Sequence, residues 1–417
     1  MSATASASPG KPQLLGLDEA IGRILARVAA PEAADSETVS TFSALGRVLA
    51  ADVRSQLDVP PADNSAMDGY ALRAADVARA GTVLPVSQRI VAGSIGGPLA
   101  PGSAARIFTG AQIPEGADAV VMQEQCTAVE AGVRVDTTVR AGDSVRRRGE
   151  DVERGARVLA AGIRLTPQAL GMAASVGAAE LQVARRPRVA LFSTGDELAM
   201  PGEALKPGAI YNSNRFTLRA LVEAMGGVHD DLGIVPDRLD ATRAALKRAA
   251  AASDLIITCG GMSVGEEDHL RAAVGHEGRI DLWQIAMKPG KPLAFGEVFR
   301  GDGTSAWFVG LPGNPVSAFV TFLVAARPVL LRLQGATSLA PRSIAMRADF
   351  AWPKPDKRRE FLRVRRNDGG GLDLFGHQGS AVLTSTIWAD GLVDNPGGQA
   401  IAPGDTVRYL PLSELLR

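Results

Sequence analysis

The 417-residue chain contains very little cysteine or histidine. Its two cysteines, Cys126 and Cys259, lie far apart in the sequence, which argues against a disulfide framework and against a cysteine-based zinc site. The four histidines are scattered, and no Ser-His-Asp or Cys-His pattern indicates nucleophilic catalysis. Because such sparse cysteine is typical of a reducing compartment, we expect a cytoplasmic protein.

The chain also lacks an excess of charge and a long apolar run. Lysine plus arginine equals aspartate plus glutamate at 45 each, so no overall field attracts nucleic acid or an acidic membrane. No uninterrupted apolar run approaches the roughly 20 residues of a membrane span. Residues 1–13 are rich in alanine and serine without the apolar core of a signal peptide, which predicts a disordered tail. We therefore expect a soluble protein with no nucleic-acid partner and no membrane partner.

Length and patterning predict several domains. A chain of 417 residues corresponds to about three domains. Apolar residues recur at helical spacing over 17–29, and Thr166 and Pro167 begin a second helix that ends near residue 178. We expect these two helices to pack together in a discontinuous helical or linker domain made of residues 14–52 and 152–184. Short apolar runs punctuated by glycine predict an inserted β domain over 53–151.

The second half of the chain predicts an α/β domain over 185–335, followed by a C-terminal β domain. The expected strands cover 188–193, 228–235, 254–259, 280–287, 292–299 and 305–311. Continuous apolar strands that alternate with helices are typical of a mostly parallel sheet covered on both faces. Residues 340–417 return to short strands with glycine and proline turns, which predicts a β-barrel-like domain. The predicted fold class is thus multidomain, combining α/β and β domains.

Three polar loops follow strands of the α/β domain, at 194–198, 260–268 and 312–317. Ligands bind beyond the carboxyl ends of the strands in such sheets, so we expect these loops to form one rim. The loop after Cys259 is neither a Walker A loop nor a G-x-G-x-x-G fingerprint, although its glycines permit close backbone approach to a phosphate. Phosphate binding and an ordinary glycine turn both remain open for this loop.

Two stretches near the end of the domain indicate an anion site. The Lys-Pro-Gly-Lys-Pro stretch at 288–292 places the ammonium groups of Lys288 and Lys291 close together. Asn314 is a suitable N-cap, a proline follows it at the first helical position, and Ser317 adds a hydroxyl. Free N–H groups at a helix start beside two lysines suit a multiply charged anion. An isolated glycine turn before a helix is more often plain structure, and it is the combination of the two stretches that favours an oxyanion or phosphate.

Carboxylates in or near the same loops indicate a cation beside the anion. They are Asp196, Glu197, Asp237, Glu266 and Asp268. Hard oxygens suit Mg²⁺, which keeps several waters and bridges to substrate phosphates. Each carboxylate alone could equally be part of a capped turn or a salt bridge, and residue type does not exclude a glycosidase-like pair.

Read together, these motifs resemble the molybdopterin molybdenumtransferase family, the MoeA-like proteins whose animal relative is the E domain of gephyrin. The matching stretches occur in the family's order and span nearly the whole chain, at 64–71, 108–111, 148–151, 193–198, 260–265, 288–292 and 311–315. The resemblance implies an elongated four-domain homodimer whose α/β domain is of the molybdopterin-binding type. The implied reaction inserts molybdenum from molybdate into adenylylated molybdopterin and releases AMP with the help of Mg²⁺.

The resemblance also implies roles for individual residues. Those implicated in catalysis are Asp68, Thr109, Asp151, Glu197, Asp237, Asp268 and Lys288. Those placed around the oxyanion are Ser263, Lys288, Lys291, Pro312, Ser317 and Arg358, with Arg359 adjacent to the last, and the predicted N-cap adds Asn314. Mg²⁺ is expected at Glu197, Asp237 and Asp268, with Asp68, Thr109 and Asp151 facing them from the neighbouring subunit.

Two departures from the family pattern accompany the resemblance. Some relatives carry a basic residue at the position of Gln284, so one cationic contact to the pterin or phosphate is missing here or supplied elsewhere. Met262 stands where valine is usual. The alternatives are a gephyrin-like scaffold and a relative that inserts tungstate. The protein partners expected besides a second copy of the chain are a molybdopterin adenylyltransferase and molybdoenzyme chaperones.

Overall fold

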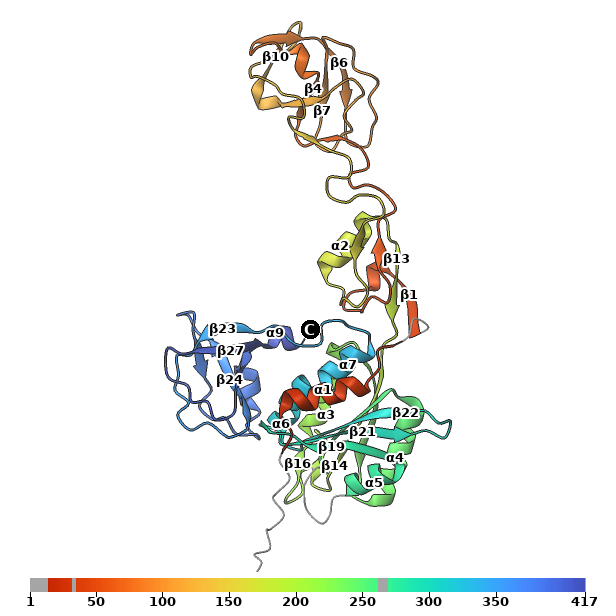
Figure 1. Cartoon of the computed structure of the whole chain (residues 1–417), viewed down its shortest axis with the longest axis vertical. Helices are drawn as coiled ribbons and strands as arrows, with labels where there is room; N and C mark the ends of the chain where they lie inside the picture. The colour runs from red at the N-terminus through yellow and green to blue at the C-terminus, as the bar shows by residue number, and fades with distance from the viewer. Residues whose placement is uncertain (1–13, 32–34, 262–268, 417) are drawn as a thin grey trace, which may run out of the picture.

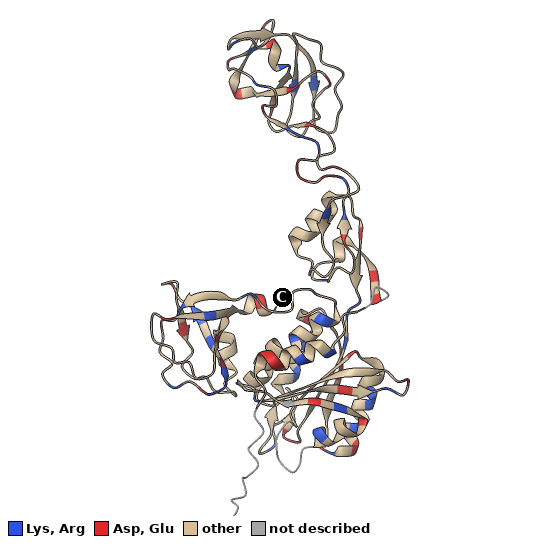
Figure 2. Cartoon of the chain, viewed as in Figure 1, with Lys and Arg blue, Asp and Glu red and all other residues tan. Residues whose placement is uncertain are grey.

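The computed structural model describes residues 14–31, 35–261 and 269–416. The described chain is elongated, with a β domain at one end, a small linker region in the middle, and an α/β domain and a C-terminal β domain at the other end (Figure 1). Lysine and arginine are interspersed with aspartate and glutamate in each of these parts (Figure 2). The predicted multidomain fold class is therefore confirmed.

The α/β domain contains a six-stranded sheet in the order β17-β14-β18-β22-β21-β19. The first four strands of this order are parallel to one another, and the last two run antiparallel to their neighbours. The strands are β14 (Arg188–Thr194), β17 (Val228–Val235), β18 (Leu255–Cys259), β19 (Gly278–Gln284), β21 (Pro292–Phe299) and β22 (Ser305–Leu311). The predicted mostly parallel sheet is confirmed.

Helices cover both faces of this sheet because side chains alternate along its buried strands. On β14, Val189 and Leu191 belong to one core and Ala190 and Phe192 to the other. The first core includes helices α1 (Leu17–Arg27), α3 (Ser213–Ala224), α6 (Pro315–Thr321) and α7 (Arg327–Leu333). The second includes helices α4 (Leu239–Ala252) and α5 (His269–Glu277).

The helical segment Pro315–Leu333 combines α6, the π-helical turn η5 (Phe322–Ala326) and α7. It is long and apolar enough to cross a membrane by length and composition alone. However, 78% of its apolar window is buried inside the protein, where it packs against the sheet. Its apolar character therefore has a structural explanation within the α/β core.

The inserted β domain contains two main sheets over two small cores. The first consists of β4 (Gly69–Leu72), β6 (Val86–Ile90), β7 (Ala104–Ile107) and β8 (Ala119–Met122). The second consists of β5 (Thr82–Leu84), β9 (Cys126–Val129) and β10 (Gly132–Val135). A short pair, β3 (Asn64–Ser65) with β11 (Val145–Arg146), lies near its entry and exit.

In the linker region, segments before and after the β insertion pair with one another. Strand β1 (Ser36–Ser40) pairs with β13 (Glu180–Ala184), and β2 (Val53–Arg54) pairs with β12 (Arg157–Leu159). Helix α2 (Pro167–Ser175) begins as predicted, because the Thr166 side chain accepts a hydrogen bond from the Ala169 N–H.

The expected packing of the first helix against the second is wrong. Helix α1 contacts α7, and its buried residues Leu17, Ile24 and Val28 belong to the α/β core, whereas α2 packs in a separate small core. The apolar stripe of α1 was read correctly. Periodicity identifies such a stripe but does not say which surface covers it.

The C-terminal β domain takes one strand from the preceding domain. Strand β20 (Met287–Lys288) pairs in parallel with β24 (Arg359–Arg366), so that Lys288 lies opposite Glu360. The other strands are β23 (Ile344–Arg347), β25 (Leu372–Leu374), β26 (Gly391–Asn395) and β27 (Thr406–Pro411), and the helices are α8 (Thr384–Trp388) and α9 (Leu412–Leu415). A bridge between Ala348 and Leu372 joins β25 to the end of β23, so hydrogen bonding continues around a ring of strands.

Candidate functional site

The loops after β14, β18 and β22 lie against one another at the carboxyl ends of the parallel strands. A Cβ atom on Gly260 would stand 2.4 Å from the Thr194 carbonyl oxygen, and one on Gly313 would stand 3.7 Å from Gly260 Cα. The Asn214 amide, at the start of α3, donates to Cys259 Sγ at 3.0 Å and to the Gly313 carbonyl at 2.6 Å. The expected common rim is thus present for the described parts of the three loops.

The Lys-Pro-Gly-Lys-Pro stretch packs onto helix α6. Gly290 has a φ of +109°, and a Cβ atom there would stand 2.2 Å from Thr321 Oγ1 and 3.6 Å from the Ser317 carbonyl oxygen. Only glycine fits both this backbone conformation and this contact. The turn between the two lysines is therefore held against helix α6.

At the start of α6, the C-terminal domain takes part in the contacts. Asn314 occupies the N-cap position, and the proline after it stands in the first turn, but the Asn314 side chain makes no capping hydrogen bond. Its amide instead donates to Ser380 Oγ at 3.1 Å, and the Val316 N–H donates to the Ser380 carbonyl at 3.0 Å. Asn314 is therefore the N-cap residue, as predicted, but the acceptor for the Val316 N–H is the Ser380 carbonyl and not the Asn314 side chain. Ser317 lies in the same turn and is buried.

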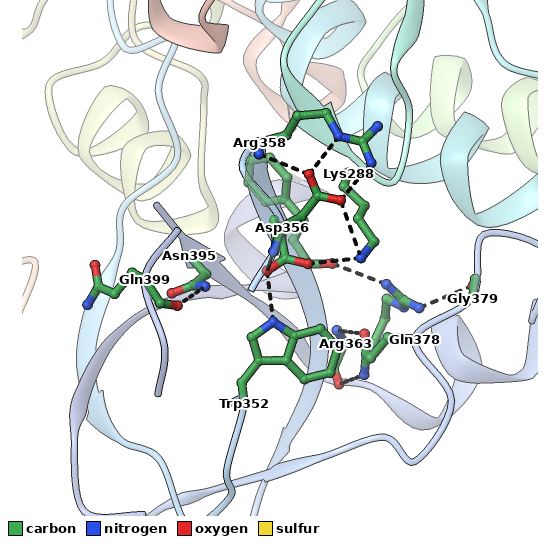
Figure 3. Close-up of polar contacts among 11 residues, drawn as sticks. Lys288, Trp352, Asp356, Arg358, Arg363, Gln378, Gly379, Asn395 and Gln399 are labelled. Atoms are coloured by element: carbon green, nitrogen blue, oxygen red, sulfur yellow. Dashed lines mark hydrogen bonds and ion pairs between the residues drawn. The ribbon is translucent and has the colours of Figure 1, made fainter. Parts of the chain in front are cut away.

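Lys288 lies between two carboxylates of the C-terminal domain (Figure 3). Its Nζ atom is 3.2 Å from Glu360 Oε1 and 3.7 Å from Asp356 Oδ2. Glu360 is only 1% exposed, and its other oxygen accepts hydrogen bonds from Trp352 Nε1 at 2.8 Å and from the Asp356 N–H at 3.1 Å. A buried carboxylate with all of these partners is a fixed anchor for the lysine.

The two adjacent arginines point to different partners. Arg358 forms a bidentate pair with Asp356, with Nη2–Oδ2 at 2.8 Å and Nε–Oδ1 at 2.9 Å. This hydrogen bonding holds the pKa of Asp356 well below its usual value. Arg359 instead pairs with the buried Asp394 and, at 2.7 Å, with Asp18 of α1. Arg358 is thus the arginine that shares a cluster with Lys288.

A cleft of about 760 Å³ opens beside this cluster, between the start of α1 and the C-terminal domain. Four cationic side chains line it, namely Lys357, Arg358, Arg359 and Arg408. Asp18, Glu19 and Asp394 line it too, so its walls carry both signs of charge.

The carboxylates expected to bind Mg²⁺ are only partly placed. Glu197 follows β14 and Asp237 follows β17, which are neighbouring strands. The Asp237 N–H lies 3.4 Å from Asp196 Oδ1, so these two loops touch. Asp268 lies outside the described residues, as do Ser263, Glu266 and Met262. Within the described part of the chain, no cluster of three or more histidine, cysteine, aspartate or glutamate side chains could hold a metal ion.

Cys259 ends strand β18 beside the rim, and its side chain is buried. Cys259 Sγ is buried and donates to the Pro312 carbonyl at 3.1 Å, which fixes the backbone just before the glycine turn at 313. Burial raises the pKa of the Cys259 thiol to about 12, so it is neutral at physiological pH. Gln284 ends β19 and pairs with Pro292.

The residues implicated in the inserted domain form their own cluster. Asp68 Oδ1 accepts hydrogen bonds from the Thr109 N–H at 2.8 Å and from Thr109 Oγ1 at 2.7 Å, and the first of these lowers the pKa of Asp68. The Asp151 N–H donates to the Val59 carbonyl in the connection toward the linker region. Figure 1 places the inserted domain at the opposite end of the chain from the α/β domain, so one chain alone does not bring these residues to the rim.

The arginine run before Asp151 is used within the inserted domain and its connection. Arg147 pairs with Asp63 at 2.7 Å, and Arg148 pairs with Asp58 at 2.6 Å. Both arginines are more than half exposed, so the run lies on a solvated face.

Sequence reasoning missed the acceptors around Lys288. Asp356 and Glu360 are distant from it in the sequence, and no motif connects them to the lysine. The available signal was the glutamate directly before the apolar pair at 361–362 of β24, because a buried glutamate needs a partner.

Comparisons with known proteins cover the whole chain. The MoeA N-terminal region (domains I and II) matches residues 15–177, a probable molybdopterin binding domain matches 190–332, and the MoeA C-terminal region (domain IV) matches 345–412. A molybdopterin molybdenumtransferase from Haemophilus influenzae is 38% identical over 97% of this chain and 100% of its own length. Another protein of that name, from a Nostoc species, is 38% identical over 91% of this chain and 89% of its own length.

A solved structure of similar shape agrees with these matches. The molybdopterin biosynthesis MoeA protein from Pyrococcus horikoshii superimposes with a TM-score of 0.83 and 28% identity, covering 96% of this chain and all of that one. The family resemblance inferred from the motifs is confirmed. The chain belongs to the MoeA family, whose named relatives are the molybdopterin molybdenumtransferases.

Proposed function

We propose that this protein is a molybdopterin molybdenumtransferase that inserts molybdenum from molybdate into adenylylated molybdopterin and releases AMP. The observation that carries the proposal is that Lys288 and Arg358 share one carboxylate, Asp356, where the Lys-Pro-Gly-Lys-Pro stretch pairs with the C-terminal domain. A relative named for this activity is 38% identical over 97% of the chain.

In this proposal the cationic groups bind the molybdate substrate. Molybdate is a tetrahedral dianion, which suits separated ammonium and guanidinium groups together with a serine hydroxyl such as that of Ser317. The glycine turn at 260–261 lies against Thr194, where a Cβ atom at either position would stand less than 3 Å from a Thr194 oxygen. The role of these residues is to hold the oxyanion and the pyrophosphate of the nucleotide-linked pterin next to each other.

Mg²⁺ suits the carboxylates near the rim. Glu197 and Asp237 would hold it, together with Asp268, since two loops carrying hard oxygen donors meet there. When bound, the ion would supply positive charge to the pyrophosphate oxygens. We expect a chelator to stop AMP release and added Mg²⁺ to restore it.

The complete site would need two copies of the chain. Asp68, Thr109 and Asp151 lie in the inserted domain, far from the rim of their own chain (Figure 1). A homodimer in which the inserted domain of one subunit reaches the rim of the other would unite the two groups. A molybdopterin adenylyltransferase and molybdoenzyme chaperones are natural cytoplasmic partners, because the substrate must arrive adenylylated and the product must be passed on.

The direct test mixes the purified protein with adenylylated molybdopterin, Mg²⁺ and either molybdate or tungstate. We expect metal analysis to show molybdenum bound to the pterin and chromatography to show AMP released in equal amount. AMP release without metal incorporation would refute the transferase role. Insertion of tungsten alone would assign the protein to a tungsten-inserting branch.

A further inference from the structure

We propose that Asp356 is an internal counter-anion, which occupies the cationic groups of the oxyanion site and which molybdate must displace. The inference rests on the proposed function, because it takes Lys288 and Arg358 as the groups that bind the oxyanion. It assigns Asp356 as a residue that sets the affinity and the charge selectivity of the site.

Both carboxylate oxygens of Asp356 are directed at these cations (Figure 3). Oδ2 lies 2.8 Å from Arg358 Nη2 and 3.7 Å from Lys288 Nζ. Oδ1 accepts hydrogen bonds from Arg358 Nε at 2.9 Å and from the Arg358 N–H at 3.0 Å. A carboxylate bound in this bidentate manner occupies the same donors that a tetrahedral oxyanion would use.

Asp356 determines the net charge of the cluster that would bind molybdate. The formal charges of Lys288, Arg358, Asp356 and Glu360 cancel, so the four groups together offer no net attraction to a dianion. If Asp356 turns away, the remaining three groups carry a net positive charge. The site then attracts a dianion such as molybdate.

Only one of the two carboxylates is free to turn. Glu360 is 1% exposed and is held by Trp352 and by the backbone N–H of Asp356. The side chain of Asp356 is 24% exposed, and the side chains of its partners Arg358 and Lys288 are 28% and 39% exposed. Glu360 therefore anchors Lys288, whereas Asp356 competes with the ligand.

The test is calorimetric titration of the full-length protein with molybdate. We expect Asp356→Asn to lower the Kd for molybdate roughly three- to tenfold, the range for losing a competing, partly exposed ion pair. Asparagine keeps the oxygen that accepts the Arg358 N–H. The variant Asp356→Glu keeps the negative charge and should bind molybdate as wild type does. The matched control is Asp349→Asn, because Asp349 pairs with a single arginine, Arg347, elsewhere in the same domain. If Asp356→Asn does not fold, Asp356→Ser serves the same purpose.

A second anion distinguishes loss of a competing carboxylate from a loosening of the loop that carries Asp356. Perrhenate is tetrahedral but carries one negative charge, so its affinity should rise less in Asp356→Asn than that of molybdate does. The inference is overturned if Asp356→Asn gains equally in affinity for both anions, or if its Kd for molybdate is no lower than that of Asp349→Asn. In either case, molybdenum insertion by the wild-type protein leaves the proposed function intact. If the wild-type protein neither binds molybdate nor inserts molybdenum, the proposed function fails and this inference fails with it.

Discussion

The ammonium group of Lys288 lies 3.2 Å from the buried carboxylate of Glu360, in a stretch that pairs with the C-terminal domain. The lysine has two roles as a result. It offers charge to an oxyanion, and it compensates a carboxylate that is almost wholly out of water.

Replacing Lys288 by alanine should therefore affect activity and stability together. We expect molybdenum insertion at low molybdate to fall by at least about a hundredfold, since a charge-assisted contact in the reacting complex is lost. The free energy of unfolding should fall by about 1–3 kcal/mol, because Glu360 loses its cation. Insertion assays and urea titration measure the two effects.

The matched control for this lysine is Lys247→Ala, on α4. Lys247 pairs with Glu277 and is well exposed. Its helix, α4, covers the face of the sheet opposite to α6. That variant should insert molybdenum as wild type does and lose less than about 1 kcal/mol. Wild-type insertion by Lys288→Ala would show that the lysine does not bind the oxyanion.

Cys259 gives a pH dependence whose direction follows from burial. Its pKa rises from the ordinary 9.0 to about 12, so the folded protein keeps the thiol proton that the unfolded chain loses above pH 9. The thiol's contribution to stability is therefore complete below pH 9 and declines between pH 9 and about 12. We expect wild type to lose up to about 1.4 kcal/mol more per pH unit in this window than Cys259→Ala, measured by urea titration. Identical slopes would mean that the thiol is not buried.

At the scale of elements, the turn of the Lys-Pro-Gly-Lys-Pro stretch on α6 is the critical contact. Gly290→Ala would place a methyl group 2.2 Å from Thr321 Oγ1, and Thr321 is fully buried in the helix. We expect this change to lower stability by about 2–4 kcal/mol and to abolish most molybdate binding, because the two lysines move with the turn.

Gly303 offers a close control for this change. It also has a positive φ, +83°, but nothing lies within 4 Å of the position where its Cβ would stand. Gly303→Ala should cost only about 1 kcal/mol of backbone strain and leave molybdate binding unchanged. Similar losses in both variants would show that the backbone conformation matters and the contact with α6 does not.

The elements themselves could be predicted well from the sequence. Strands β14, β18 and β22 and the helix after Asn314 lie where continuous apolar runs and turn residues predicted them. The pairing of β20 with β24 could not be predicted, because a two-residue strand has no periodic pattern of its own.

Only the part of the candidate site that belongs to the α/β domain was predictable from the sequence. The lysines and the glycine turns stand in recognisable motifs, but Asp356, Glu360 and Ser380 come from a domain whose docking the sequence does not specify. The N-cap position of Asn314 was predictable, but its hydrogen bond to Ser380 was not, since Ser380 approaches from that domain. Side-chain partners that depend on the contact between two domains need the tertiary structure.

At the scale of the whole molecule, the described chain separates its two groups of functional residues. The rim, the lysines and the C-terminal domain lie at one end, and the cluster around Asp68 and Thr109 lies at the other (Figure 1). The account therefore predicts that each active site is shared between two chains, with the inserted domain of one subunit serving the rim of its partner.

Heterodimers carrying Lys288→Ala in one chain and Asp68→Asn in the other test this claim most directly. The two chains would be co-expressed with different affinity tags, purified in two steps and assayed for molybdenum insertion. Each variant alone should be inactive, whereas the heterodimer retains one intact site of two and should show about half of wild-type activity. An inactive heterodimer, or a protein from which no heterodimer can be isolated, would contradict the shared site.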